Sequence, residues 1–251
     1  MSNSIRAPLA ELVGSFAFFF IGAGAICSDA YTRGGVGLVG VALAHGLILS
    51  VMISALGAIS GGHFNPAVTI AFLVTGRIPT AQAVAYVVAQ LVGGTIAGLL
   101  LRAIFAAVFP EAVIGPAHLG TPGLARDVSF GTGVLVEAVL TFFLLLAIYG
   151  TAVDERAPRS IAGFGIGLTV GLDILMGGPL TGAAMNPART FGPAVAAQFW
   201  DNHLVYWIGP IVGAVIAALL YEYAFMDKVP VLPASPEPPV AGPEPPQPSV
   251  S

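Results

Sequence analysis

The stretch "SGGHFNPAVT" (residues 60–69) places a histidine, an asparagine and a proline between two long apolar segments. A second stretch, "TGAAMNPART" (residues 181–190), repeats the pattern about half a chain later, with Asn186 in the place of Asn65. Asn followed by Pro is a helix-start signal, because Asn caps the first turn and Pro fits the first helical position without losing a needed N–H. The two stretches therefore predict two short helices that each begin at an Asn-Pro pair.

Composition places these motifs in a membrane protein. Of the 251 residues, 56% are hydrophobic and 9% are charged, against roughly 25% charged in soluble domains. Six apolar stretches approach the roughly 20 residues that a helix needs to cross a bilayer, and none alternates as a barrel strand would. The predicted spans are 8–28, 37–57, 82–108, 130–152, 161–178 and 203–226.

Several other classes of protein are excluded. The first stretch carries Glu11 and has a counterpart later in the chain, so we interpret it as a retained span and not as a secretory signal. The single cysteine, Cys27, forms no intrachain disulfide and leaves the redox compartment open. A net charge of −4 argues against a nucleic-acid partner. We find no nucleophile–base set, no phosphate loop and no metal-ligand spacing among the four histidines, so we predict neither an enzyme nor a cofactor nor a metal site.

The chain is a duplicated unit. Around the two motifs, "YVVAQLVGGTIAGLL" (86–100) matches "YWIGPIVGAVIAALL" (206–220), and "AELVGSF" (10–16) matches "VEAVLTF" (136–142). Three spans per unit is an odd number, so the second copy enters the bilayer upside down and the two motifs approach each other at mid-membrane.

The fold class is therefore an all-α membrane protein, with six transmembrane helices and two re-entrant half-helices in an inverted repeat. The runs after the two Asn-Pro pairs are too short to span, and non-helical backbone at that depth is tolerated only where it lines a watery cavity. We expect a cytoplasmic N-terminus (1–7), a first repeat (8–108) with half-helix 66–75, an extracellular loop (109–129), a second repeat (130–226) with half-helix 187–198, and a disordered, Pro-rich cytoplasmic tail (227–251).

At these residues the sequence resembles the aquaporin, or major intrinsic protein, family over about residues 5–226. The resemblance implies a passive water channel that excludes protons. It rests on the paired motifs Asn65, Pro66, Ala67 and Asn186, Pro187, Ala188.

The residues support that implication physically. Two half-helix N-termini that meet in a pore place a positive partial charge of roughly half a unit each at its centre, which repels cations. The amides of Asn65 and Asn186 can each donate to the oxygen of a passing water and so interrupt a proton-hopping chain. His63 beside the first motif is predicted to line the pore.

Glu11 and Glu137 occupy matching places in the two halves. A carboxylate inside a span is costly enough to indicate a function. The resemblance implies that the two glutamates brace the re-entrant loops by accepting backbone N–H bonds, with a proton relay as the alternative.

The resemblance also places a selectivity filter, which counting from the motifs puts at His45, Ile174, Ala183 and Arg189. This set resembles that of plant tonoplast-type aquaporins, with a histidine in the second span and an isoleucine in the fifth. A neutral His45 that both donates and accepts could pass a polar solute on to Arg189. We expect water to permeate, together with ammonia, urea and hydrogen peroxide, and glycerol in last place.

Two departures from the pattern stay open. Asp173 stands at a position where the resemblance to tonoplast-type channels implies an Asn. It either pairs with Arg189 or faces a polar loop. His118 resembles a loop histidine that adds a fifth filter contact in some tonoplast-type members. Because the surrounding loop differs in length from theirs, a solvated loop histidine is the alternative.

Orientation and location follow from charge and from local resemblance. Basic residues are more frequent on the side that carries both termini, so we predict cytoplasmic termini. The loop "AVDERAP" (152–158) resembles microbial, including archaeal, members, which favours a prokaryotic plasma membrane over a vacuolar one. The resemblance also implies a homotetramer with one pore per chain.

Two other functions compete with a channel. Secondary transporters also use inverted repeats with broken helices, but their paths usually carry ionisable groups, and here Arg189 is the one strong charge expected in the pore. A membrane junction or scaffold protein would not need the intact pair of motifs.

Overall fold

The computed structural model describes residues 3–111, 115 and 117–226, and this part of the chain is helical without β-strands. The predicted Pro-rich tail (227–251) lies outside the described residues. The elements are α1 (Asn3–Tyr31), α2 (Gly37–Ser60), α3 (Pro66–Val74), α4 (Thr80–Val108), η1 (His118–Gly120), α6 (Phe130–Ile148), η2 (Tyr149–Val153), η3 (Arg159–Ile161), α7 (Ala162–Thr181), α8 (Pro187–Ala197), α9 (Val205–Leu220) and η4 (Tyr221–Phe225).

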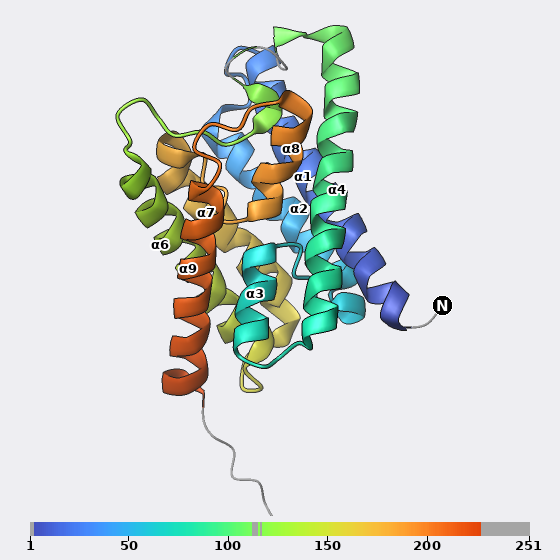
Figure 1. The fold of residues 1–251 in the computed structure, drawn as a ribbon, viewed down its shortest axis with the longest axis vertical. Helices are drawn as coiled ribbons and strands as arrows, with labels where there is room; N and C mark the ends of the chain where they lie inside the picture. The colour runs from blue at the N-terminus through green and yellow to red at the C-terminus, as the bar shows by residue number, and fades with distance from the viewer. Residues whose placement is uncertain (1–2, 112–114, 116, 227–251) are drawn as a thin grey trace, which may run out of the picture.

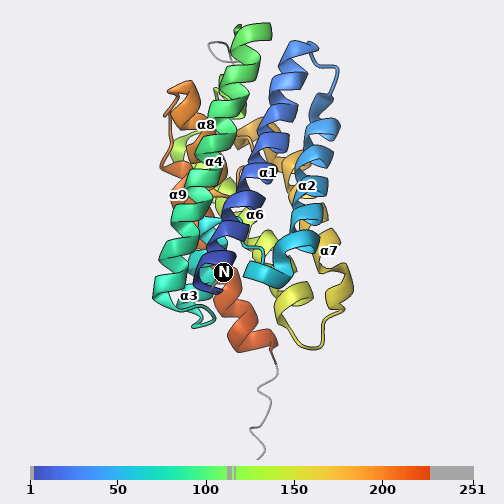
Figure 2. The ribbon, with the colours of Figure 1, turned by 90° about the vertical axis from the view of Figure 1, so that its right-hand side faces the viewer.

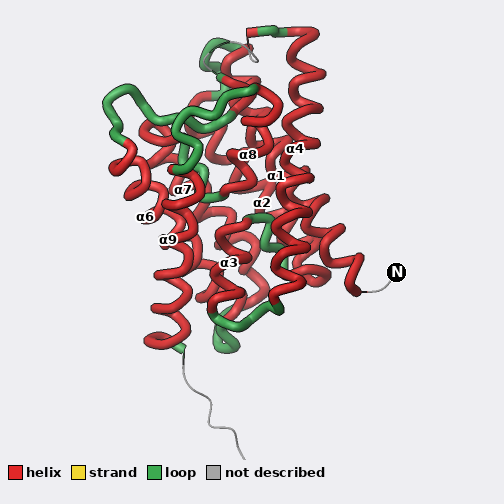
Figure 3. Tube along the Cα trace, viewed as in Figure 1, coloured by secondary structure: helices red, strands yellow, loops and turns green. Residues whose placement is uncertain are grey.

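Six of these helical segments are long and apolar enough to cross a membrane, which confirms the predicted fold class. The short helices α3 and α8 lie in the lower and upper halves of the molecule in Figure 1, and Figure 2 shows the same order. We call the end at which η4 leaves toward the C-terminus the lower side and the opposite end the upper side. The described residues 117–129 between α4 and α6, and the loop between α8 and α9, lie on the upper side (Figure 3).

Polarity is reversed relative to a soluble protein. The outer face of α4 exposes Val84, Val88, Val92 and Ile96 at a spacing of four residues. Glu11, Glu137 and Gln90, in contrast, are fully buried. Apolar side chains outside and polar ones inside suit a helix bundle whose surroundings are lipid, so the chain is an integral, multi-pass membrane protein.

The same close helix contact occurs once in each half. A Cβ atom at Gly93 of α4 would lie 2.4 Å from the backbone oxygen of Leu12 in α1. One at Gly213 of α9 would lie 1.9 Å from the backbone oxygen of Ala138 in α6. Only glycine permits either approach, and these contacts hold one helix of each half, α4 or α9, against the helix that carries the buried glutamate, α1 or α6.

Candidate functional site

Both half-helices begin at the predicted asparagines. Asn65 and Asn186 have extended backbone, at φ −157° in each case, and Pro66 and Pro187 follow at the first helical position. Asn65 Oδ1 accepts from Ala67 N at 2.9 Å. Asn186 Oδ1 accepts from Ala188 N at 3.0 Å and more weakly from Arg189 N. The caps explain why both helices start here, because each satisfies a backbone donor that the first turn leaves free.

The two asparagines also join the halves to each other. Asn65 Nδ2 donates to the backbone oxygen of Met185 at 2.8 Å, and Asn186 Nδ2 donates to that of Phe64 at 2.9 Å. Each amide nitrogen has two N–H groups, so one per asparagine is left over. Both side chains line a cavity of about 170 Å³, and the free N–H groups can serve a molecule inside it.

This cavity extends from the two asparagines to Ala152 and Val153 of η2, and we call it the lower cavity. Its lining is largely apolar, apart from His63 and the two asparagines. Among the described residues, no Asp, Glu, Lys or Arg lines it. The apolar lining includes Leu49, Phe72, Ile148, Ile166 and Val170.

Glu11 holds the loop before the first half-helix. Its Oε1 accepts from Ser60 Oγ at 2.6 Å and from His63 N at 2.9 Å. Its Oε2 accepts from Phe64 N at 2.6 Å and from Gln90 Nε2 at 2.8 Å. Four donors therefore converge on one buried carboxylate.

Glu137 holds the second loop with matching geometry. Oε1 accepts from Thr181 Oγ1 at 2.6 Å and from Ala184 N at 3.0 Å, and Oε2 accepts from Met185 N at 2.7 Å. The loops need such support because Phe64, Ala183 and Met185 have positive φ angles of 45–51°. Residues other than glycine pay for this conformation, about 1–2 kcal/mol each. Glu11 and Glu137 thus lie beside the strained loops and accept their backbone N–H groups, as the predicted bracing role requires.

On the upper side, His45, Ile174 and Arg189 line a second cavity of about 330 Å³, the upper cavity. Ala183, the fourth predicted filter residue, is buried, and its neighbour Gly182 lines this cavity instead. Three of the four filter positions therefore come together in the structure.

Both ring nitrogens of His45 are already engaged. Nδ1 lies 2.8 Å from the backbone oxygen of Val41, which can only accept, so Nδ1 carries the hydrogen. Nε2 then accepts from Arg189 Nη2 at 3.3 Å. The expected relay, in which His45 donates to one side of a solute and accepts on the other, does not fit this geometry. His45 instead helps to orient Arg189.

A second contact fixes the arginine. Arg189 Nη1 donates to the backbone oxygen of Gly120 at 3.0 Å, in the loop on the upper side. His118, two residues earlier, stacks on Phe199 with 3.8 Å between ring centroids and an angle of 4°. His118 is not among the residues that line the upper cavity, so the loop contributes a carbonyl there, and the first of the two alternatives for His118, a fifth filter contact, is not found.

Three contributors to the site were not singled out from sequence. Thr69 and Gln90 are fully buried and bond to each other and to the first loop. Gly22 makes room for the filter histidine, since a Cβ atom there would lie 2.5 Å from the His45 ring. A glutamine inside an apolar span was the available signal for Gln90.

The first of the two alternatives for Asp173, a pairing with Arg189, is not found. Asp173 is 7% exposed, and within the described part of the chain no hydrogen bond to it, from Arg189 or from any loop residue, is found. Its Oδ2 is buried without a partner.

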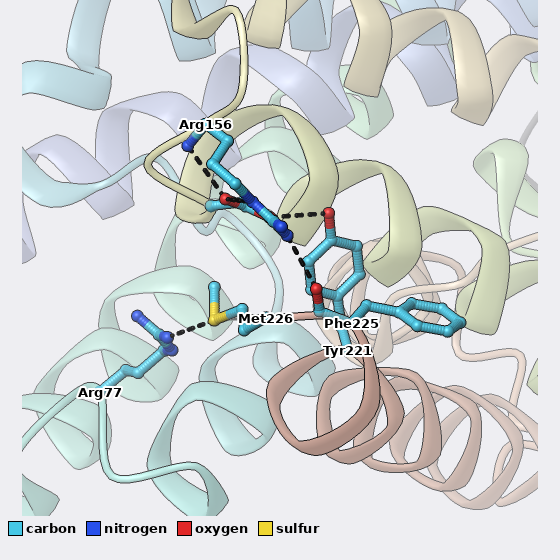
Figure 4. Close-up of polar contacts among 6 residues, drawn as sticks. Arg77, Arg156, Tyr221, Phe225 and Met226 are labelled. Atoms are coloured by element: carbon cyan, nitrogen blue, oxygen red, sulfur yellow. Dashed lines mark hydrogen bonds and ion pairs between the residues drawn. The ribbon is translucent and has the colours of Figure 1, made fainter. Parts of the chain in front are cut away.

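A polar cluster at the lower side ties η4 and Met226 to two loops (Figure 4). Arg77 bonds to both carboxylate oxygens of Glu222, at 2.7 and 3.0 Å, and its Nη2 lies 3.0 Å from Met226 Sδ. In the other loop, Arg156 Nη2 donates to Asp154 at 2.7 Å and also to the backbone oxygen of Phe225.

The charge of Asp154 is favoured by this arrangement. Hydrogen bonds from the Arg156 side chain and backbone hold the pKa of the Asp154 carboxyl below its ordinary value. Tyr221 Oη adds a weaker contact at 3.3 Å. The cluster thus fixes the lower ends of the helices around the lower cavity.

A metal-binding group of three or more His, Cys, Asp or Glu side chains is not found among the described residues.

Comparisons with known proteins agree with this geometry. The family model described as major intrinsic protein matches residues 1–221. Aquaporin TIP4-4 of Zea mays is 48% identical, covering 90% of this chain and 88% of its own length. Probable aquaporin TIP3-2 of Arabidopsis thaliana is 44% identical, covering 90% and 86%. The X-ray structure of the aquaglyceroporin from Plasmodium falciparum superposes with a TM-score of 0.75 at 25% identity, covering 88% of this chain and 96% of that one.

Proposed function

Because the chain belongs to the major intrinsic protein family, whose members are channels and not enzymes, we propose that it is a proton-excluding water channel that also passes small neutral solutes. The observation that carries the proposal is the crossed pair of asparagines. Each gives one N–H to the opposite loop and keeps one for the cavity.

Proton exclusion follows from what those N–H groups and the helix ends do together. A water whose oxygen accepts from Asn65 or Asn186 turns its hydrogens away from the centre, so the donor–acceptor chain along the pore reverses there. The two half-helix N-termini add positive potential at the same place, which disfavours a hydrated proton.

Solute passage rests on Arg189 and Ile174 in the upper cavity. Arg189 has five N–H groups and uses two of them on Gly120 and His45, which leaves three for a permeating molecule. Ile174 supplies the less polar wall opposite hydrogen-bonding groups. We infer permeability to ammonia, urea and hydrogen peroxide, with glycerol in last place.

Two features favour a channel over a transporter or a scaffold. A proton-coupled transporter needs ionisable groups along its path. No Asp, Glu, Lys or Arg is among the described residues that line the lower cavity, and Asp29 and Arg189 are confined to the upper cavity, so such groups do not continue along the path. The cavities on both sides of the asparagine pair would serve no purpose in a scaffold.

For orientation, the positive-inside rule assigns the lower side, with Arg77 and Arg156, to the cytoplasm and the upper side to the exterior or lumen. The relatives named above are plant proteins of TIP type, which supports a vacuolar membrane and does not support the prokaryotic plasma membrane that the loop at 152–158 favours. Assembly as a homotetramer with one pore per chain remains part of the proposal.

Stopped-flow light scattering on proteoliposomes tests the solute part. Ammonia, urea and glycerol are offered in turn, and each flux is divided by the water flux of the same vesicles. We expect His45→Phe with Ile174→His to lower the solute-to-water ratio by about tenfold, the effect of roughly 1.4 kcal/mol in the barrier. An unchanged ratio would show that these residues do not set selectivity.

A further inference from the structure

Thr69 in α3 is a buried hydroxyl that touches three polar groups. Its Oγ1 lies 3.0 Å from the backbone oxygen of Asn65, 3.0 Å from Gln90 Nε2 and 3.1 Å from His63 Nδ1. A hydroxyl has one hydrogen to donate and two lone pairs to accept with. The carbonyl can only accept and the amide nitrogen can only donate. All three contacts are therefore hydrogen bonds at once only if His63 Nδ1 carries a hydrogen and donates it.

The orientation of the Gln90 amide is fixed by a second acceptor. Gln90 Nε2 also donates to Glu11 Oε2 at 2.8 Å, and that oxygen accepts from Phe64 N as well. Turning the amide over would place its oxygen against both the carboxylate and a hydroxyl that has no hydrogen left for it. Gln90, Thr69 and Glu11 are each 0% exposed, so water does not compete for these bonds.

The other nitrogen of His63, Nε2, is the one left to serve the lower cavity. His63 lines this cavity, and no partner for its Nε2 is found in the part of the chain that the structure describes. Phe72 packs on the imidazole with 4.5 Å between ring centroids, and the ring of Tyr86 meets it edge-on at 5.4 Å. These contacts restrict rotation of the ring and so hold Nε2 in one place.

We propose that Thr69, polarised by Gln90, locks His63 in the Nδ1–H tautomer, so that Nε2 is a fixed hydrogen-bond acceptor for molecules that cross the lower cavity. Gln90 and Thr69 are positioning residues, and His63 is the residue that meets the permeating molecule. His63 Nε2 binds small neutral molecules that donate an O–H or N–H hydrogen, such as water or ammonia.

The acceptor complements the asparagine donors in the same cavity. A water that gives a hydrogen to His63 Nε2 turns its oxygen toward the remaining N–H of Asn65. His63 thus orients molecules on the lower side before they reach the centre, a consequence that rests on the proposed channel function.

Solid-state NMR of the full chain in lipid bilayers, labelled with ¹³C and ¹⁵N at histidine, tests the tautomer directly. Cδ2 of imidazole is bonded to Nε2, so a one-bond correlation from Cδ2 reports whether that nitrogen carries hydrogen. Signals of His63 are assigned by their loss in His63→Gln, and His45, whose Nδ1 faces the oxygen of Val41, is the internal reference. We expect an unprotonated Nε2 in His63, and a protonated Nε2 overturns the proposal.

Variants test what holds the tautomer. Thr69→Val removes the hydroxyl at nearly constant volume and is expected to give a mixture of both tautomers, whereas Thr69→Ser restores the single one. The matched control is Thr190→Val, at the equivalent place in the second half, where the hydroxyl has no partner in the described structure. A single tautomer in Thr69→Val would show that this network does not control the ring.

Permeability supplies the second readout. Thr69→Val is expected to lower the water flux per channel by roughly threefold, a smaller effect than the loss of one ordinary hydrogen bond would have on the rate. Thr190→Val is expected to leave the water flux unchanged. Equal losses in both variants contradict the proposal. Because the NMR result does not depend on transport, a locked tautomer in a protein without water flux would refute the channel function and leave the tautomer assignment standing.

Discussion

The two halves of the inverted repeat keep one scaffold and differ in the chemistry beside it. In both, a glutamate accepts two loop N–H groups and one hydroxyl, from Ser60 in the first half and Thr181 in the second. Tyr86 and Tyr206 each donate to the backbone oxygen of that hydroxyl residue at 2.7 Å. These shared contacts fix the strained loops and hence the position of each asparagine.

Around this scaffold the halves diverge at three places. His63, Val68 and Gln90 of the first half correspond to Ala184, Arg189 and Pro210 of the second. The first half therefore offers a neutral acceptor to the lower cavity, and the second offers a cation to the upper one. The duplicated sequence gives both halves the same scaffold, and substitutions at a few positions give the two cavities different hydrogen-bonding groups and charge.

The largest effect should come from the shared scaffold. Glu11→Leu and Glu137→Leu each leave two buried N–H groups without an acceptor, and we expect a loss of at least about 3 kcal/mol of unfolding free energy. Glu11→Leu should be the worse, because Glu11 also accepts from Gln90. Thermal unfolding in detergent measures this, with Glu222→Gln of the partly exposed pair with Arg77 as a control worth at most about 1 kcal/mol. Equal stability of the wild type and either leucine variant would refute the bracing role.

The next effect concerns the difference between the halves. Arg189→Val gives the second half the residue found at Val68 in the first and removes the cation from the upper cavity. Loss of the guanidinium removes hydrogen-bond donors but also widens the upper cavity, and because urea is larger than water we expect the widening to dominate. The ratio of urea to water flux should rise about tenfold, corresponding to roughly 1.4 kcal/mol in the barrier. The control is Val68→Ala, which alters the lower cavity without touching a charge and should leave the ratio unchanged. If both variants change it equally, Arg189 is not the element that distinguishes the ends.

A smaller effect is expected at the lower side, where the second half alone supplies the pair of Asp154 and Arg156. Since the pKa of Asp154 is lowered in the folded protein, its contribution to stability is complete above the ordinary aspartate pKa of about 4 and is lost as the pH falls below it. The unfolding temperature of the wild type should therefore drop more on acidification than that of Asp154→Asn. Parallel curves for the two proteins would contradict this.

The smallest effect should come from an unused hydroxyl. Thr190→Val removes a buried group that has no hydrogen-bond partner in the described structure, so stability should change by no more than about 0.5 kcal/mol. Thr69→Val removes a hydroxyl with three partners and should cost about 1–3 kcal/mol. Chemical unfolding in detergent compares the two, and a reversed order would mean that the hydroxyl network is not what stabilises the first half.

Sequence alone was sufficient for the features that repeat. Apolar length predicts the spans, and Asn followed by Pro predicts where the half-helices start, because both are local properties of the chain. The counterpart positions of Glu11 and Glu137 follow from the repeat itself.

What could not be predicted depends on which atoms meet across the bundle. The position of His45 on its helix follows from counting, but the engagement of Nδ1 by Val41 and of Nε2 by Arg189 does not. The stacking of His118 on Phe199 depends on the path of a loop, which has no periodicity to read. Thr69 gives no signal of its own in the sequence, and its role appears only where its hydroxyl meets Gln90 and His63.

The central claim is that the crossed asparagines conduct water and stop protons, and one measurement tests it most directly. Proteoliposomes that enclose a pH-sensitive dye are subjected to an osmotic gradient and then to a proton gradient, so that water and proton fluxes come from the same vesicles. We predict fast water flux with a low activation energy and proton flux equal to that of empty liposomes. Proton flux above that background, or a water flux that saturates and depends on the proton gradient, would contradict the account.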